Sequence, residues 1–96
     1  MATREDIIEK LRAFKLSITG RYPIASLALF GSFARGEQNP SSDIDVLVEF
    51  NGRIGSSFFK LADELEKQLG GKIDLVSKNG IKPKYFSAIQ SDLIYV

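Results

Sequence analysis

The chain has 96 residues, of which 44% are hydrophobic and 26% are charged, and its formal net charge is +1 at pH 7. These values are ordinary for a globular protein, and the length fits one domain spanning residues 1–96. Without a basic excess, direct binding to nucleic acid is not expected. Histidine and cysteine are absent, which excludes disulfides, zinc sites built on those residues and a histidine general base.

The first predicted element is a helix that begins after Thr3, with Asp6 in its first turn. Apolar residues follow at helical spacing as far as Ile18, and Gly20 and Pro23 end the helix. This segment is amphipathic and contains acids, unlike a signal peptide. No apolar run approaches the ~20 residues that span a bilayer. We therefore expect a cytoplasmic protein without membrane contact.

Two strands are predicted next, separated by a glycine turn. Residues 24–30 form a largely apolar run that predicts a buried strand. Gly31 breaks this strand, and residues 32–37 can form one helical turn before a polar loop. Residues 44–50 are apolar and β-branched, which predicts the second strand, and Asn51 with Gly52 predicts a turn after it.

The second half of the chain alternates between helix and strand. We expect a long helix over residues 56–69, a strand over 72–77, a last helix from about residue 84 and a short extended tail. Apolar residues in the last segment are expected to close the core. This order predicts an α+β fold in layers, in which a small mixed β-sheet is flanked by helices.

Three aspartates are the candidate chemical groups. On a strand, residues two apart share a face, so Asp43 and Asp45 face the same way if the strand extends back to Asp43. Asp74 has apolar neighbours, which predicts a strand in the interior of the sheet, where an unpaired charge is unfavourable. If this strand lies beside residues 44–50, all three carboxylates form one cluster.

Such a cluster needs compensation. Two carboxylates ~4 Å apart repel by about 4 kcal/mol at an effective dielectric constant near 20. A divalent cation on oxygen ligands, magnesium or manganese, is the simplest partner in a chain without histidine. The alternative is structural: Asp43 caps a turn, Asp45 is a solvated strand residue and Asp74 pairs with a lysine. The glycine turn and the third aspartate weaken this alternative.

The turn after the first strand has the features of a phosphate-binding turn. Gly31 lets the backbone approach a phosphate, and the Ser32 hydroxyl adds a donor. A simple strand-to-helix turn capped by serine explains the same pair. Arg35 can reach a phosphate, pair with a carboxylate or point to solvent. Ser41 or Ser42 is expected to cap the loop locally.

The segments GSFARG (residues 31–36) and SDID (residues 42–45), with Asp74 one helix downstream, resemble the signature of the DNA polymerase beta-like nucleotidyltransferase superfamily. The small size narrows the resemblance to minimal nucleotidyltransferases of the MNT antitoxin type, over nearly the whole chain. Every key position of the motif is present, so the resemblance implies an active enzyme.

The resemblance implies a role for each site residue. Gly31 and Ser32 would hold a nucleoside triphosphate. Asp43 and Asp45 would ligate magnesium ions, two when the nucleotide is bound, and manganese could replace them. Asp74 would complete the second metal site and activate the incoming hydroxyl, which attacks the α-phosphorus while pyrophosphate leaves.

The resemblance also implies a partner and a function. MNT proteins pair with HEPN-domain ribonuclease toxins and neutralise them by transferring AMP from ATP to a toxin tyrosine. One alternative is a nucleotidyltransferase acting on another protein or on a small molecule. Another is a non-catalytic antitoxin that blocks its partner sterically. Base preference, acceptor and oligomeric state cannot be read from the sequence.

Overall fold

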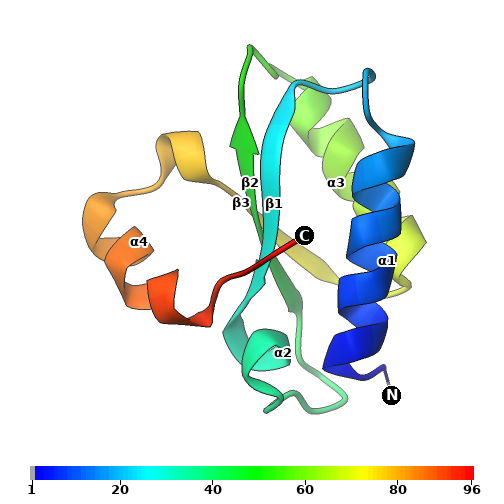
Figure 1. Cartoon of the computed structure of the whole chain (residues 1–96), viewed down its shortest axis with the longest axis vertical. Helices are drawn as coiled ribbons and strands as arrows, with labels where there is room; N and C mark the ends of the chain where they lie inside the picture. Colours follow the sequence, from blue (N-terminus) through cyan, green and yellow to red (C-terminus); the bar gives the residue numbers. More distant parts are fainter. Residues whose placement is uncertain (1) are drawn as a thin grey trace.

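The computed structural model describes residues 2–96 and shows a small sheet between helices (Figure 1). The expected elements occur in the expected order, with boundaries within about two residues of those predicted. The elements are α1 (Arg4–Ser17), β1 (Ile24–Phe30), α2 (Gly31–Arg35), β2 (Ile44–Phe50), α3 (Ser57–Leu69), β3 (Ile73–Ser77), the 3₁₀ turn η1 (Lys78–Gly80), α4 (Pro83–Ile89), the 3₁₀ turn η2 (Gln90–Asp92) and β4 (Ile94–Tyr95).

The sheet is mixed and has the strand order β3-β2-β1-β4. β1 pairs antiparallel with β2 and with β4, whereas β2 and β3 are parallel. Parallel neighbours require a long crossover connection, which α3 supplies. The predicted α+β fold with a small mixed sheet is therefore confirmed.

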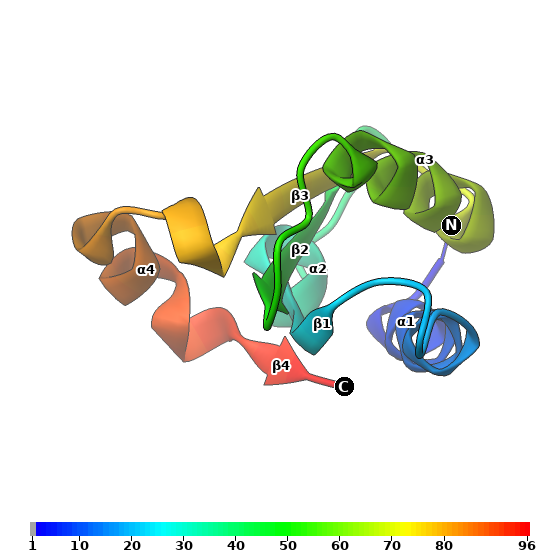
Figure 2. The same ribbon diagram turned by 90° about the horizontal axis from the view of Figure 1, so that it is seen from above.

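The helices lie in two layers, one on each face of the sheet. Figure 2 shows α1 and α3 on one side and α4 on the other. The larger core cluster lies between the sheet and the pair α1 and α3, with Leu11 and Leu65 fully buried in it. A smaller cluster of Ala28, Phe30, Leu47 and Ile89 lies under α4. The middle strands β1 and β2 are thus covered on both faces.

The two clusters fix the direction of the side chains on β2. Ile44, Val46 and Val48 belong to the cluster under α1 and α3. Because side chains alternate along a strand, Asp45 must point to the other face, together with Leu47. The packing of the apolar residues therefore places Asp45 on the α4 side of the sheet.

The start of α1 follows the sequence prediction. The Thr3 hydroxyl accepts a hydrogen bond from the Asp6 backbone N–H, and the Asp6 carboxylate accepts one from the Thr3 N–H, each at 3.1 Å. This reciprocal capping box satisfies donors that a helix leaves free at its first turn.

Within residues 2–96, no helix is long and apolar enough to cross a membrane.

The C-terminal segment closes the core in part. Ile89 is buried, and Phe86 and Leu93 pack on the cluster under α4. Two aromatic rings of this segment, Tyr85 and Tyr95, stay about half exposed. On α3, Phe58 packs against the larger core cluster whereas its neighbour Phe59 is 71% exposed, as expected for adjacent residues on a helix.

The Asn79 side chain continues the pairing of β2 beyond the end of β3. Its Oδ1 accepts a hydrogen bond from the Phe50 N–H at 2.9 Å, and its Nδ2 donates one to the Phe50 carbonyl at 3.1 Å. We expect Asn79→Ala to lower the free energy of unfolding by about 1–2 kcal/mol, because two partly buried backbone groups lose their partner. Urea denaturation measures this change.

The control for that experiment is Asn51→Ala, since Asn51 bonds to Pro23 through its backbone N–H. Asn51→Ala should change stability by less than about 0.5 kcal/mol. Equal losses in the two variants would contradict a specific role for the Asn79 amide.

Candidate active site

The turn between β1 and α2 brings the backbone against a carboxylate. Gly31 has φ +77°, a conformation that favours glycine. A Cβ at this position would lie 2.1 Å from Asp45 Oδ2 and 3.0 Å from Asp45 Cγ. A glycine is therefore required both by the backbone conformation and by the close approach of Asp45.

On the side away from the Gly31 turn, Asp45 faces the carboxylate of Asp74. The register pairs Asp45 with Phe30 on β1 and with Asp74 on β3. Residues directly opposite each other on neighbouring strands have adjacent side chains on the same face. The Asp45 and Asp74 carboxyl groups come within hydrogen-bonding reach of each other. The structure thus brings together Gly31, which follows the end of β1, Asp45, near the start of β2, and Asp74, near the start of β3.

This environment raises the pKa of Asp45 to about 6. Burial contributes most, the negative charges of Asp74 and Asp43 come next, and the hydrogen bond with Asp74 adds to them. The positive charge of Arg35 acts in the opposite direction. The Asp45 carboxylate is therefore under-compensated at neutral pH, as the charge argument from the sequence predicted.

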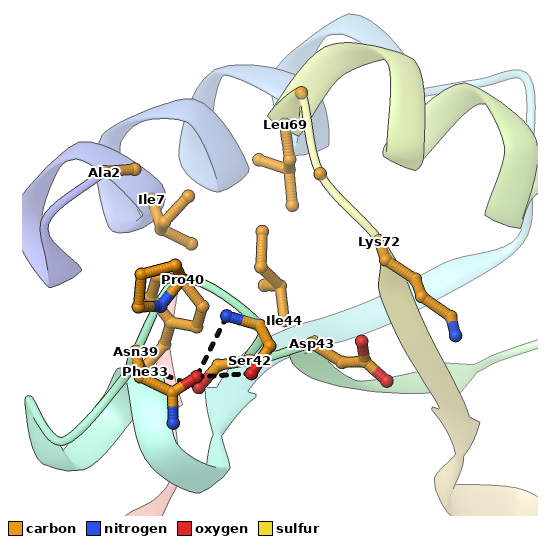
Figure 3. Close-up of a pocket in the computed structure, with 13 residues that line it drawn as sticks. Ala2, Ile7, Phe33, Asn39, Pro40, Ser42, Asp43, Ile44, Leu69 and Lys72 are labelled. Carbon is orange, nitrogen blue, oxygen red and sulfur yellow. Dashed lines mark hydrogen bonds between the residues drawn. The ribbon is translucent and has the colours of Figure 1, made fainter.

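Asp43 lies just outside the strand. β2 begins at Ile44, whose N–H donates to the Lys72 carbonyl at 2.8 Å, so Asp43 precedes the ladder by one residue. The strand begins at the predicted residue, so the condition for Asp43 and Asp45 to share a strand face, extension back to Asp43, is not met. The Asp43 charge still raises the pKa of Asp45. Asp43 is half-buried, and in Figure 3 its carboxylate points away from Ile44 and toward the side on which Lys72 extends.

The predicted place of Asp74 needs a correction. The sequence favoured a strand in the interior of the sheet, but β3 is an edge strand and Asp74 is exposed. Its apolar neighbours Ile73 and Leu75 pack on the core under α1 and α3, which explains the apolar pattern without burial of the carboxylate. An exposed position at the sheet edge leaves Asp74 accessible to another molecule.

The loop between α2 and β2 is held by its own polar side chains. The Asn39 Oδ1 accepts hydrogen bonds from the Ser41 N–H at 2.9 Å and from the Ser41 hydroxyl at 2.7 Å. The Ser42 Oγ accepts one from the Asn39 N–H at 2.9 Å. Local capping by Ser41 and Ser42 is confirmed. Ser32 is half-buried in the first turn of α2, directly after Gly31.

Arg35 pairs with two carboxylates, one of which the sequence gave no reason to expect. Its Nε donates to Glu37 Oε1 at 2.7 Å, and its Nη1 donates to Asp92 Oδ2 at 2.6 Å. Glu37 is two residues away, whereas Asp92 lies in η2, near the end of the chain. A signal for this contact could come only from covariation between the two positions.

A pocket of about 280 Å³ opens beside Asp43 (Figure 3). Ile7, Leu69 and Ile44 form its apolar wall, and Asp43 and Lys72 lie at its edge. The pocket is on the side of β2 that faces α1 and α3. It therefore does not include Asp45 and Asp74, which lie on the opposite face.

The three aspartates do not form the single metal-holding cluster that the sequence suggested, but their chemistry suits a metal ion. Their carboxylate oxygens are hard ligands, which Mg²⁺ and Mn²⁺ prefer. Within residues 2–96, no three side chains of the types Asp, Glu, His or Cys lie close enough together to hold an ion on their own. Mg²⁺ commonly binds to one or two carboxylates together with phosphate oxygens of a substrate. The donor set fits an ion of that kind rather than a resident structural metal.

Comparison with known proteins identifies the family. The profile of the nucleotidyltransferase domain family matches residues 8–96. A Methanocaldococcus jannaschii protein, provisionally named a protein adenylyltransferase, is 46% identical over 100 residues that cover all of both chains. The protein adenylyltransferase MntA of Thermococcus cleftensis is 36% identical over 98 residues, covering 100% of this chain and 98% of its own.

Solved structures agree with this assignment. A minimal nucleotidyltransferase superposes with a TM-score of 0.81 at 33% identity, over 97% of this chain and 95% of that one. A chain from the complex of a tri-AMPylated Shewanella oneidensis HEPN toxin with an MNT antitoxin shares the fold, with a TM-score of 0.60 at 20% identity over 96% of this chain and 66% of that one. The chain therefore belongs to the nucleotidyltransferase domain family and is a minimal nucleotidyltransferase.

Proposed function

We propose that this protein is a magnesium-dependent adenylyltransferase that transfers AMP from ATP to a tyrosine of a HEPN-domain ribonuclease toxin and so acts as its antitoxin. The observation that carries the proposal is the position of Asp45. Its carboxylate lies between the Gly31 turn on one side and Asp74 on the other. An under-compensated carboxylate pair beside a backbone turn suits the binding of a metal-bound triphosphate.

In this proposal, the Gly31–Ser32 turn binds the triphosphate. The backbone at Gly31 can approach an oxyanion closely because no Cβ is present, and the Ser32 hydroxyl supplies a further donor. Asp43 and Asp45 would hold the magnesium ions. When bound, magnesium neutralises the developing charge on the phosphate oxygens and orients the α-phosphate for in-line attack.

The transfer step then requires one proton acceptor. The tyrosine oxygen forms a bond to the α-phosphorus, the bond from that phosphorus to the β-phosphate oxygen breaks, and pyrophosphate leaves. Asp74 takes the phenolic proton and passes it to solvent. Its exposed place on the edge strand β3 allows an acceptor side chain of another protein to reach it.

The named relatives support the acceptor class. Two of them carry the name protein adenylyltransferase, and both match this chain over its full length. The complex with the AMPylated HEPN toxin contains a chain of the same fold.

The test is transfer of label from ATP to protein. Purified protein is mixed with magnesium, ATP labelled at the α-phosphate and the product of the neighbouring gene. We expect label on the partner, and Asp74→Asn should reduce the initial rate by about 10²- to 10⁴-fold, the usual contribution of a general base. Mass spectrometry of the labelled partner locates the modified side chain.

Two controls give the experiment its meaning. ATP labelled at the γ-phosphate should leave no label, because pyrophosphate departs. Asp63→Asn removes an exposed acid from α3, on the opposite face of the sheet, and should retain the full rate. No labelling despite a stable complex and good binding of magnesium-ATP would refute the proposed acceptor. No binding of nucleotide at all would favour a steric antitoxin.

A further inference from the structure

Arg35 connects two segments that are far apart in the sequence. It extends from α2 and bonds with separate nitrogens to Glu37 and to Asp92. The Asp92 side chain is only 18% exposed, whereas that of Glu37 is 64% exposed. Of these two contacts, the one with Asp92 is the more enclosed, and it joins α2 to a distant element, η2.

Asp92 is a firm anchor because its neighbours are fixed in the fold. Leu93, the next residue, packs on the cluster under α4. Ile94 and Tyr95 pair with Leu29 and Ala28 on β1. The backbone at Asp92 is therefore fixed two residues before β4, which pairs with β1, the strand from which the Gly31 turn emerges.

The helix that Arg35 holds is short. α2 has five residues, begins at Gly31 and ends at Arg35. Its buried residues Phe33 and Ala34 pack on the core. The Ser32 carbonyl accepts a hydrogen bond from the Glu37 N–H at 2.8 Å, and the Ala34 carbonyl accepts one from Arg4 Nη1 at 3.4 Å. After Arg35 the chain turns at Gly36, in the left-handed conformation, into a polar loop. A contact at its last residue therefore restricts the orientation of the whole turn, including Ser32.

We propose that Arg35, through its ion pair with Asp92, is a positioning residue that holds the Gly31–Ser32 turn in the orientation that binds the triphosphate of a nucleoside triphosphate. This inference rests on the proposed function. The pair is half-exposed on the arginine side, so its contribution to global stability is small. The Arg35–Asp92 pair instead raises the fraction of molecules in which the Gly31–Ser32 turn has the orientation that binds the triphosphate. The apparent dissociation constant of a ligand rises in inverse proportion to that fraction.

The experiment compares variants that release the pair in different ways. Asp92→Asn removes the anchor and leaves Arg35 in place. The exchange Arg35→Asp with Asp92→Arg reverses the pair. Glu37→Gln removes only the local partner of Arg35. The matched control is Glu64→Gln in another part of the molecule: Glu64 pairs with Arg21 at 3.0 Å and also accepts a hydrogen bond from the Tyr22 hydroxyl.

Two readouts separate positioning from mere stability. Calorimetric titration with magnesium and a non-hydrolysable ATP analogue gives the dissociation constant, and initial rates at saturating ATP give kcat. We expect Asp92→Asn to raise the dissociation constant about tenfold and to leave kcat within about twofold. Glu64→Gln and Glu37→Gln should leave the dissociation constant within about twofold. The exchanged pair should recover most of the lost affinity.

Each other outcome has a definite meaning. An unchanged dissociation constant in Asp92→Asn would overturn the proposal. A loss of kcat in the exchanged pair, while Asp92→Asn keeps its kcat, would show instead that Arg35 contacts the nucleotide directly. Thermal unfolding of each variant identifies any that fails to fold, and Asp92→Asn remains decisive if the exchange does. Failure of the wild-type protein to bind the nucleotide would refute the proposed function itself.

Discussion

Replacing Asp45 with asparagine should abolish nucleotidyl transfer and, in the absence of metal, stabilise the protein at pH 7.5. The carboxylate is partly buried and faces Asp74, and this environment raises its pKa to about 6. Removing its charge relieves the repulsion in the folded state. It also removes the proposed metal ligand, for which we expect a loss of transfer of at least about 10³-fold.

The pH dependence has a definite sign. The pKa of Asp45 in the folded protein, about 6, lies above the ordinary value of 3.8, so the folded state binds the proton more tightly than the unfolded state. The metal-free protein should therefore gain stability as the pH falls from about 7 to about 4. The rise of the Asp45 pKa from 3.8 to about 6 corresponds to about 3 kcal/mol. Because the group is partly exposed, we expect about 1–2 kcal/mol.

Urea denaturation in the presence of a chelator at pH 5.0 and pH 7.5 measures this effect. The wild-type protein should be less stable at pH 7.5, and Asp45→Asn should remove most of the difference. Asp63→Asn, on the far face of the sheet, is the control and should preserve it. If Asp45→Asn is no more stable than the wild type at pH 7.5, the Asp45 carboxylate is not destabilised by its burial and by the charges of Asp74 and Asp43. Magnesium-ATP should stabilise the wild-type protein and Asp63→Asn, but not Asp45→Asn.

Most of the fold could be predicted from the sequence because local signals and global packing agree. The Thr3 cap, the apolar spacing of α1 and the glycine after β1 each have one simple structural solution. The i and i+2 rule placed Ile44 and Val46 opposite Asp45, and the core cluster confirms it. Such agreement between levels is what a well-specified fold requires.

Strand order could not be predicted, and this caused the error at Asp74. An apolar run is consistent with an interior strand or with an edge strand covered on one face, and periodicity does not distinguish them. β3 is an edge strand whose residues Ile73 and Leu75 pack against the core. For the last residues the sequence predicted only an extended tail. In the structure they include β4, which pairs with β1, and Asp92 just before it bonds to Arg35.

The individual site residues were therefore easier to name than their surroundings. Residue type and spacing marked Gly31, Asp43, Asp45 and Asp74, and the register brings Asp45 and Asp74 together. The partner of Arg35 depends on a contact over 57 positions, which no local pattern contains. Long-range pairs of this kind follow from topology, and topology follows from strand order.

Gly31→Ala should both destabilise the protein and eliminate transfer. Alanine at φ +77° is strained by about 1 kcal/mol, and its Cβ would also meet the Asp45 carboxyl group at 2.1 Å. Asp45 can turn away only partly, because its Cγ and Cβ lie 3.0 and 3.3 Å from the same point. We expect a total loss of about 2–3 kcal/mol in the free energy of unfolding.

A matched glycine separates the two contributions. Gly70, which ends α3, has φ +71°, and a Cβ there would have no atom within 4 Å among the residues that the structure describes. Gly70→Ala should therefore cost only the conformational part, about 1 kcal/mol, and leave transfer intact. Combining Gly31→Ala with Asp45→Ala should recover part of the excess, since contacting residues couple in double-mutant cycles. Equal losses for Gly31→Ala and Gly70→Ala would mean that Asp45 does not press on the turn, and the proposed binding of phosphate beside that carboxylate would lose its structural basis.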